Sequence, residues 1–356
     1  MKKFIFSISL FIPLLFYSQG GNTPKYSNEF LNIGVGARAL GMSNSVVTST
    51  DDVFSGFWNP ANLTKIKSDI QIGLMHSEYF AGIAKYDFGS IAKRIDEKSA
   101  FAFSFLRFGV DNIPNTTELI DAQGNINYDR ISFFSAADMA FLLSYGRKLN
   151  DQLSVGGSAK IINRKAGDFA TAWGFGIDLS TTYQKNNWTL ALVAKDITST
   201  FNIWNYRLTE SMIETFYLTG NDLPQNGTEI TMPRVILGAS KTLLFKKDFS
   251  LLIELNTDIT TDGRRNVLVV GNPFSIDPHI GIELNLKNLV FLRSGIGNIQ
   301  KSPDLTGKMI YTTQPNIGIG LQFKGVEVEY ALTDIGDASI ALYSNVFSLR
   351  FNLNPK

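Results

Sequence analysis

The sequence predicts an antiparallel β-barrel that spans a membrane. Three observations support this class: an apolar amino-terminal run typical of an export signal, strand-length segments in which apolar and polar residues alternate, and connections of two distinct lengths. In a membrane barrel one face of each strand meets lipid and the other lines the lumen, so apolar and polar side chains alternate. The sheet has to close on itself, because an open edge cannot lie in lipid.

The amino-terminal run begins with two lysines, continues with apolar residues from Phe4 to Tyr17 and ends at Ser18. A positive start, a short apolar core and a small residue before the cut are typical of a secretory signal peptide. The run is shorter than the roughly 20 apolar residues that a membrane-spanning helix needs. We therefore expect residues 1–18 to be a signal peptide.

The composition agrees with a membrane barrel. Mean hydropathy is +0.02, only 18% of the residues are charged, and the chain holds 27 Phe and 12 Tyr. Alternating strands average to about this hydropathy, and aromatic rings suit the girdles of a barrel at both membrane surfaces. The net charge of +1 argues against a nucleic-acid partner. The absence of cysteine excludes disulfides and thiolate chemistry.

Beyond residue 68, alternation and turn residues predict about fourteen strands. In the last of them the odd-numbered residues from Phe347 to Leu353 are apolar and the even-numbered residues between them are polar. One segment is ambiguous, because Arg293 shares a face with Leu289 and Phe291. The strands are expected at residues 69–77, 79–91, 99–108, 137–147, 152–164, 172–184, 187–196, 233–243, 248–258, 278–286, 288–296, 315–323, 325–333 and 342–354.

The connections between these segments give a second, independent indication. Short turns alternate with long loops, which fall at about residues 109–136, 197–232, 259–277 and 297–314. Outer-membrane barrels have short periplasmic turns and longer outer loops. A soluble sandwich has no reason to sort its connections in this way. An even number of strands would place both termini on the periplasmic side.

Residues 20–67 precede the strands and differ from them, because they alternate poorly and are rich in glycine, asparagine and small residues. This segment contains an Ala-Arg-x-x-Gly-Met stretch, an acidic pair and an aromatic-Asn-Pro-Ala block. The residues of these motifs are Ala37, Arg38, Gly41, Met42, Asp51, Asp52, Trp58, Asn59, Pro60 and Ala61.

The motifs resemble the amino-terminal signature of the PorV/PorQ family, a branch of the FadL-like barrels. The resemblance implies a fourteen-stranded barrel, here residues 68–356, whose lumen holds an amino-terminal plug or hatch, here residues 19–67. The chain departs from the family at Ser43-Asn44-Ser45 and at Asn62, where the family has small residues or glycine. Asparagine tolerates the left-handed conformation that such a turn can require.

The resemblance also implies a function: a non-enzymatic component of the type IX secretion system in the bacterial outer membrane. PorV-like members bind the C-terminal domain of cargo, and PorQ-like members serve the attachment machinery. The implied partners are outer-membrane lipid, the type IX translocon and cargo C-terminal domains. The alternatives are a FadL-type importer of hydrophobic small molecules and a purely structural scaffold. The mostly polar inward faces argue against an importer, which needs an apolar pocket above the hatch.

Charged residues on the inward faces are the first candidate site. We expect Arg38 to pair with carboxylates of the lumen and so hold the plug, because a charge away from bulk water needs a partner. The alternative is that these charges only line a wet lumen. The candidates are Asp178, Glu254, Glu283, Glu327, Glu329 and Arg350, with Lys160 and Lys195 as further counter-charges.

The block Asn59-Pro60-Ala61 is read as a tight turn, with the alternative that it moves when a hatch opens. Aromatic residues of the long loops are candidates for a partner surface, or for a lid over the mouth. These aromatic residues are Phe134, Trp204, Tyr206, Phe216, Tyr217, Phe274 and Tyr311.

The inventory for catalysis and metal binding is poor. The two histidines, His76 and His279, are far apart in the sequence, and the common hydrolase and metalloprotease motifs are missing. The stretch from Asp258 to Gly263 resembles the start of a calcium loop, but Val269 stands where its last acid belongs. We therefore expect no catalytic residue, no cofactor and no metal site.

Overall fold

The computed structural model describes residues 27–117, 119, 124–246, 248–303, 306–333 and 343–354. The signal peptide expected at residues 1–18 lies outside these ranges. Within them, the helices are all too short or too polar to cross a membrane.

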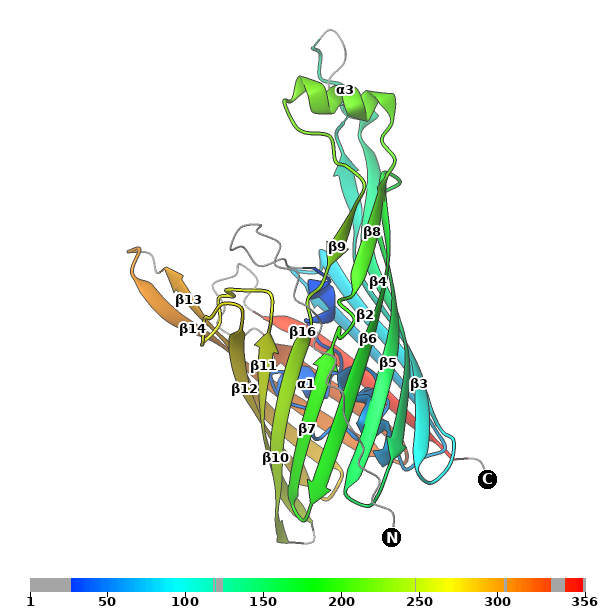
Figure 1. Cartoon of the computed structure of the whole chain (residues 1–356), viewed down its shortest axis with the longest axis vertical. Helices are drawn as coiled ribbons and strands as arrows, with labels where there is room; N and C mark the ends of the chain where they lie inside the picture. The colour runs from blue at the N-terminus through cyan, green and yellow to red at the C-terminus, as the bar shows by residue number, and fades with distance from the viewer. Residues whose placement is uncertain are drawn as a thin grey trace, which may run out of the picture.

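The described residues form one sheet of sixteen strands, and all but β8 and β9 close into an antiparallel barrel of fourteen (Figure 1). The predicted fold class is confirmed. The barrel strands are β1 (Ile70–Tyr79), β2 (Ala84–Arg94), β3 (Ser99–Asn115), β4 (Ser132–Lys148), β5 (Leu153–Ala166), β6 (Ala170–Lys185), β7 (Trp188–Lys195), β10 (Arg234–Lys246), β11 (Phe249–Thr260), β12 (Ser275–Leu286), β13 (Val290–Pro303), β14 (Met309–Phe323), β15 (Val326–Thr333) and β16 (Ser344–Leu353).

The barrel closes where the first strand meets the last. Ile70 of β1 pairs with Leu353 of β16, and the antiparallel ladder continues to Glu78 and Asn345. On its other edge β1 pairs with β2 along its whole length. Each barrel strand therefore has a partner on both sides, which satisfies the backbone polar groups that lipid cannot satisfy.

The side chains of the barrel are sorted in the sense opposite to that of a soluble protein. In β11, Glu254 is 0% exposed and points into the lumen, whereas its neighbour Leu255 is 49% exposed on the outer face. In β16, Ser348 is buried and Phe347 is exposed. Alternation with period two thus places apolar groups toward lipid and polar groups toward the interior.

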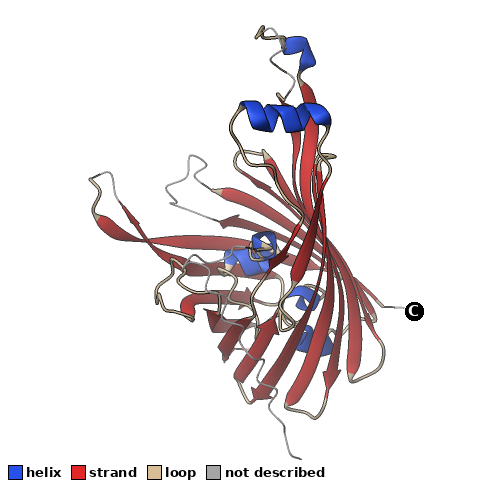
Figure 2. Cartoon of the chain, turned by 45° about the horizontal axis from the view of Figure 1, so that its top comes forward, coloured by secondary structure: helices blue, strands red, loops and turns tan. Residues whose placement is uncertain are grey.

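Residues 27–67, here called the inner segment, lie inside the barrel (Figure 2). A side chain added at Gly156 of β5 would collide with the backbone of Pro60 and Ala61, and one added at Gly295 of β13 would collide with the backbone of Met42. Because β5 and β13 stand nearly opposite each other in the ring, the segment must cross the lumen. Its helices are η1 (Glu29–Leu31), α1 (Ala37–Gly41), α2 (Ser55–Trp58) and η2 (Pro60–Lys65).

The barrel has a short-turn end and a loop end, and the loop end carries more regular structure than the sequence predicted. The expected loop at 197–232 contains β8 (Phe201–Tyr206), α3 (Glu210–Leu218) and β9 (Gly227–Ile230). We call this unit the arm; α3 lies at its tip (Figure 1). The arm forms because β6 extends beyond β7, and the free outer half of β6 pairs with β8 instead.

The loops expected at 109–136 and 297–314 are also shorter in the structure than the sequence predicts. Strands β3 and β4 continue as a paired hairpin as far as Asn115 and Ser132, with the short helix η3 (Tyr128–Arg130) in their connection. Strands β13 and β14 continue to Pro303 and Met309. Much of 109–136 and of 297–314 is therefore strand, because the neighbouring strands stay paired beyond the segments in which apolar and polar residues alternate clearly.

Candidate functional site

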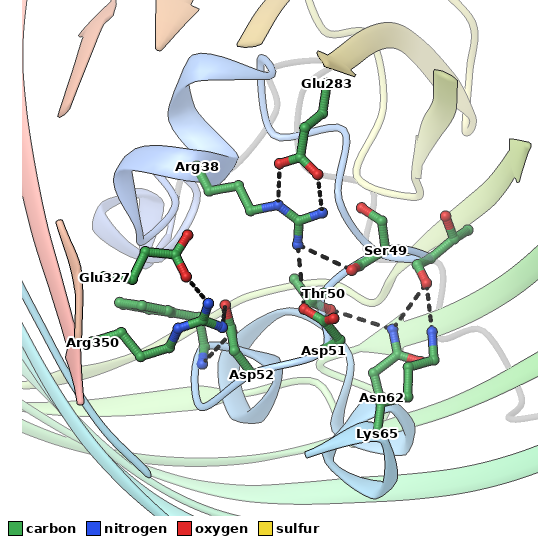
Figure 3. A network of polar contacts seen from close by, with 12 residues as sticks. Arg38, Ser49, Thr50, Asp51, Asp52, Asn62, Lys65, Glu283, Glu327 and Arg350 are labelled. Atoms are coloured by element: carbon green, nitrogen blue, oxygen red, sulfur yellow. Dashed lines mark hydrogen bonds and ion pairs between the residues drawn. The ribbon is translucent and has the colours of Figure 1, made fainter. Parts of the chain in front are cut away.

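Arg38 joins the inner segment to the barrel wall (Figure 3). It lies on α1, and its Nε donates to Glu283 Oε2 at 2.7 Å while Nη2 donates to Oε1 at 3.1 Å. Its Nη1 donates to the carbonyl of Ser49 at 3.0 Å. Burial alone would lower the pKa of Arg38, but Glu283 and Asp51 outweigh it and raise the pKa above the ordinary value. The side chain therefore stays charged and forms a two-pronged bond with the wall.

Arg293 of β13 is the centre of the same cluster, and sequence reasoning left its orientation open. Its side chain is 1% exposed, and its Nε donates to Glu283 at 2.7 Å. Its Nη1 lies 2.8 Å from Glu329, close enough for an ion pair but not aligned as a hydrogen bond, and Nη2 lies 3.5 Å from Glu327. One guanidinium thus balances carboxylates from β12 and β15. Gly295 lies two residues further along β13, on the same face as Arg293, and packs against the inner segment. A glycine at this position is the sequence feature that could have indicated an inward face.

Arg350 of β16 forms a second link between wall and inner segment. Its Nη1 donates to Asp52 at 3.0 Å, and its Nη2 contacts Glu327. Asp52 also accepts a hydrogen bond from the backbone N–H of Phe54 at 2.9 Å. Burial raises the pKa of Asp52, although Arg350 acts against that rise. The acidic pair is therefore split: Asp52 meets the wall, and Asp51 stays exposed near Arg38 at 3.8 Å.

The Asn-Pro-Ala block is attached to the wall by neutral hydrogen bonds. The amide nitrogen of Asn59 donates to the Val47 carbonyl at 2.6 Å and to Thr182 at 2.8 Å. The backbone N–H of Ala61 donates to Ser180 at 3.0 Å. Thr182 donates in turn to Asn62 at 2.9 Å. The hydrogen bonds with Ser180 and Thr182 fix this block on β6.

The two departures from the family pattern have different explanations. Ser43 and Asn44 adopt left-handed conformations, with φ of 51° and 61°, so they fill positions that favour glycine. Asn62 does not adopt such a conformation; it lies in η2 and its side chain donates to the carbonyl of Val47 at 3.1 Å. The tolerance of asparagine for the left-handed conformation is therefore not used at Asn62.

Other lumen charges are also engaged. Glu254 accepts a hydrogen bond from the backbone N–H of Thr48 at 2.7 Å, and Lys65 donates to the carbonyl of the same residue at 2.7 Å. Burial lowers the pKa of Lys65 to about 8. On the wall itself, Asp178 lies 2.8 Å from Lys160. The inner segment is thus held by charged groups on several sides.

Ser45, His279 and Asp258 stand in the order of a serine–histidine–acid triad. Ser45 Oγ lies 3.0 Å from His279 Nδ1, and His279 Nε2 lies 3.3 Å from Asp258. A nucleophile has to meet its substrate, whereas Ser45 is 0% exposed. The arrangement therefore joins the inner segment to the wall, as the ion pairs do.

The acids of the calcium-like stretch are bound by arginines. Asp258 lies in β11 and accepts from Arg234 at 3.0 Å, and Asp262 accepts from Arg265 at 2.6 Å. Burial would lower the pKa of Arg265, but its bonds with Asp262 and Glu29 raise it. Across the part of the chain that the structure describes, no group of three potential metal ligands gathers.

A cavity of about 550 Å³ lies between the inner segment and the loop end. Its lining includes Trp58, Lys195, Arg234, Asp277 and His279, so it is polar and carries charges of both signs. An apolar ligand would remove water from these charged groups and offer no hydrogen bond in return, which is costly. The cavity suits a polar ligand.

The structure does not gather the loop aromatics into one patch. The rings of Trp204 and Tyr206 stack with centroids 6.0 Å apart on β8, and Tyr311 on β14 lies 5.2 Å from the ammonium of Lys301. Among the described residues, no contact joins the rings of these residues to that of Phe274. The remaining members are Phe134 on β4 and Phe216 and Tyr217 on α3.

We expect Arg38→Ala to lower the free energy of unfolding by about 2–3 kcal/mol, because a partly buried carboxylate loses one of its two partners. Denaturant unfolding of the purified protein in detergent micelles measures this loss. The control is Arg94→Ala, whose exposed pair with Asp69 at 2.7 Å should contribute less than about 1 kcal/mol. Equal effects of the two variants would show that Arg38 does not hold the inner segment.

Comparison with known proteins adds a family and a fold. The family model described as "Type IX secretion system protein PorV" matches residues 19–208. No curated protein matches the chain. The toluene transporter TodX from Pseudomonas putida aligns with a TM-score of 0.56 at 13% identity, over 90% of this chain and 98% of that one. The toluene transporter TbuX from Ralstonia pickettii gives 0.55 at 13%, over 90% and 99%.

A FadL homologue from Pseudomonas aeruginosa aligns with a TM-score of 0.49 at 12% identity, over 89% of this chain and 98% of that one, which is too distant to add to the argument. At such identities the solved structures show the fold alone, a barrel like those of TodX and TbuX. The family model says more, because it spans over half of the 356 residues. The chain therefore belongs to the PorV family of type IX secretion system proteins, which places it in the bacterial outer membrane.

Proposed function

We propose that this protein is a non-enzymatic, partner-binding component of type IX protein secretion, with the inner segment as its plug. The observation that carries this proposal is the contrast between the two parts of the barrel. Buried ion pairs tie the inner segment to β12 and β16, while the arm and the β13–β14 hairpin project from the loop end. A sealed wall with structured projections suits a protein that binds partners at its outer end.

The orientation follows from the same contrast. The chain enters the wall at Ile70 and leaves it at Leu353, and these residues pair with each other near Lys93, beside the short β2–β3 turn. Short turns face the periplasm in outer-membrane barrels. We therefore place both termini in the periplasm and the arm outside the cell, where it would meet the translocon or the C-terminal domains of cargo.

An importer of hydrophobic small molecules is the second candidate, because TodX and TbuX are toluene transporters with the same fold. The polar cavity speaks against it, since an apolar ligand would desolvate Lys195 and Arg234. A scaffold that never touches cargo is the third candidate, and the experiment below separates it from the first.

The test is a pull-down of the tagged protein from its native outer membrane in mild detergent, followed by mass spectrometry. We expect the translocon, or proteins that share its C-terminal cargo domain, to be recovered. Recovery of the translocon without cargo would favour the scaffold. Recovery of a lone barrel with a bound apolar molecule would contradict the secretion role and favour the importer.

The arm offers a matched pair of variants for the same experiment. Tyr217 and Leu218 on α3 are 68% and 80% exposed. Replacing both with serine should reduce recovery of the partner at least about fivefold, because exposed apolar anchors carry much of the affinity of an interface. The control is Ile95→Ser, an exposed apolar residue in the turn at the opposite end, which should change nothing. Equal recovery with all three proteins would move the partner surface away from the arm.

A further inference from the structure

Three lysine or arginine side chains of the described residues are buried: Lys160, Lys195 and Arg293. Lys195 differs from the other two in its surroundings. Lys160 lies 2.8 Å from Asp178, and Arg293 is surrounded by carboxylates. In the described part of the chain Lys195 has neither a carboxylate within ion-pair distance nor a hydrogen-bond acceptor for its ammonium, although the residue is only 6% exposed. A buried charge without a partner is costly and calls for an explanation.

The surroundings of Lys195 leave one side of its ammonium open. It is the last residue of β7, and its Nζ lies 4.3 Å from the ring centroid of Phe57 and 5.4 Å from that of Trp58. The two rings of α2 offset part of the cost of burial through cation–π attraction. The residue also lines the 550 Å³ cavity and a smaller one beside it. Lys195 thus lies between the two aromatic rings of α2 and the cavity.

The charges around the cavity decide which ligand would fit. Arg234 and Arg265 line it too, but they are already bound by Asp258 and Asp262. Lys195 is therefore the cation whose charge is available. A single negative charge would match it, whereas a multiply charged anion would be repelled by the acids that line the same cavity: Glu29, Asp258 and Asp277.

The rest of the lining defines the body of the ligand. Asparagine, glutamine, serine and threonine side chains form much of the wall, and Trp58 supplies a flat apolar surface beside Lys195. The volume lies in the range that holds small organic ligands. A polar molecule would keep its hydrogen bonds there, and a long hydrocarbon chain would not.

We propose that this cavity binds a polar ligand through a single carboxylate group, and that Lys195 holds this carboxylate. The carboxylate can belong to a small free acid or to the carboxyl end of an extended peptide that enters from the loop end. The proposal does not depend on the role in secretion, because it rests on the contacts of Lys195 and on the lining of the cavity.

The test compares N-acetylglycine with N-acetylglycinamide on the purified full-length protein in detergent micelles, by isothermal titration calorimetry and ligand-observed NMR. The two probes differ only in the charge of one end. We expect saturable binding of the acid and at least about tenfold weaker binding of the amide, because a charged hydrogen bond is lost. Equal binding of both probes, or no binding of the acid, would overturn the proposal.

Variants assign the effect to one side chain. Lys195→Met should weaken binding of N-acetylglycine at least about tenfold, and Lys195→Arg should retain it. The control is Lys241→Met, since Lys241 also rests on an aromatic ring, 5.0 Å from the centroid of Trp188, but lines neither cavity. Should Lys195→Met fail to fold, the acid–amide comparison on the unaltered protein still decides. A Lys195→Met variant that binds as well as the unaltered protein would overturn the proposal.

Two further comparisons identify the source and the charge of the ligand. An acetylated glycine–serine hexapeptide with a free carboxyl end is compared with its amide. If the peptide acid binds and its amide does not, the carboxyl end of a peptide can be the ligand. If the peptide acid does not bind, the ligand is a small free acid. Succinate should bind no more tightly than N-acetylglycine, and much tighter binding of succinate would contradict the single-charge assignment.

Discussion

Arg293→Met is expected to lower the free energy of unfolding of the barrel by about 3–5 kcal/mol. The methionine would fill the volume but leave Glu283, Glu327 and Glu329 close together without the guanidinium that now lies between them. Like charges that are buried close together repel each other, and this repulsion destabilises the folded state. Denaturant unfolding in detergent micelles, followed by tryptophan fluorescence, measures the loss.

The matched control for this variant is Arg107→Met. Arg107 also lies on a barrel strand and forms an ion pair, with Asp111 at 2.9 Å, but both side chains of that pair reach solvent. We expect a loss of at most about 1 kcal/mol there. A loss of that small size at Arg293 as well would mean that its cluster does not stabilise the barrel.

Gly156→Val is expected to open the barrel. The new side chain would occupy the place of the backbone of Pro60 and Ala61, which cannot give way as a flexible side chain would. Overpacking of this kind costs about 1–3 kcal/mol or more, and here the inner segment can avoid the clash by leaving the wall. Single-channel recording in planar bilayers should show steady ion conductance for the variant and a closed barrel for the unaltered protein.

The control is Gly89→Val on β2. A side chain at Gly89 would point outward and meet only the tip of Leu74 at 3.7 Å, so it should leave the barrel closed. Both substitutions add the same side chain to a strand, and they differ only in the face on which it stands. If Gly156→Val conducts no more than Gly89→Val, the inner segment does not seal the lumen.

The strands of the barrel were predictable because lipid and lumen impose opposite demands on alternate residues. The pattern from Phe347 to Leu353 needs no tertiary information, and the structure places β16 from Ser344 to Leu353. Outside the membrane the outer face meets water, so the outward residues need not be apolar and the alternation becomes weaker. For this reason the sequence predicts loops where β3, β4, β13 and β14 extend toward the loop end.

The arm shows a second limit. Its β8 exists because β6 outlasts β7, and a difference in the length of two neighbouring strands cannot be read from either strand alone. Its helix did leave a local signal: Thr209 caps the first turn by accepting a hydrogen bond from the N–H of Met212 at 3.3 Å, and Glu210 follows it.

The candidate site divides in a similar way. The inward orientation of Glu283 and Glu327 follows from the period of their strands. The cation that pairs with each acid depends on the register between strands and on the path of the inner segment. The sequence of one strand predicts neither. Arg293 was ambiguous because Phe291, on the same face, also points inward and lies 5.2 Å from its guanidinium.

The wall residues that form ion pairs with the inner segment lie far along the chain, although the segment itself is synthesised first. Arg38 meets a residue 245 positions further on, and Asp52 meets one 298 positions further on. We expect contacts of such separation to form late, because closing a long loop costs entropy. On this expectation the amino-terminal segment stays accessible to proteases until β16 has joined β1. A chain that lacks its last strand would also lack Arg350, and with it one of the links that hold this segment to the wall.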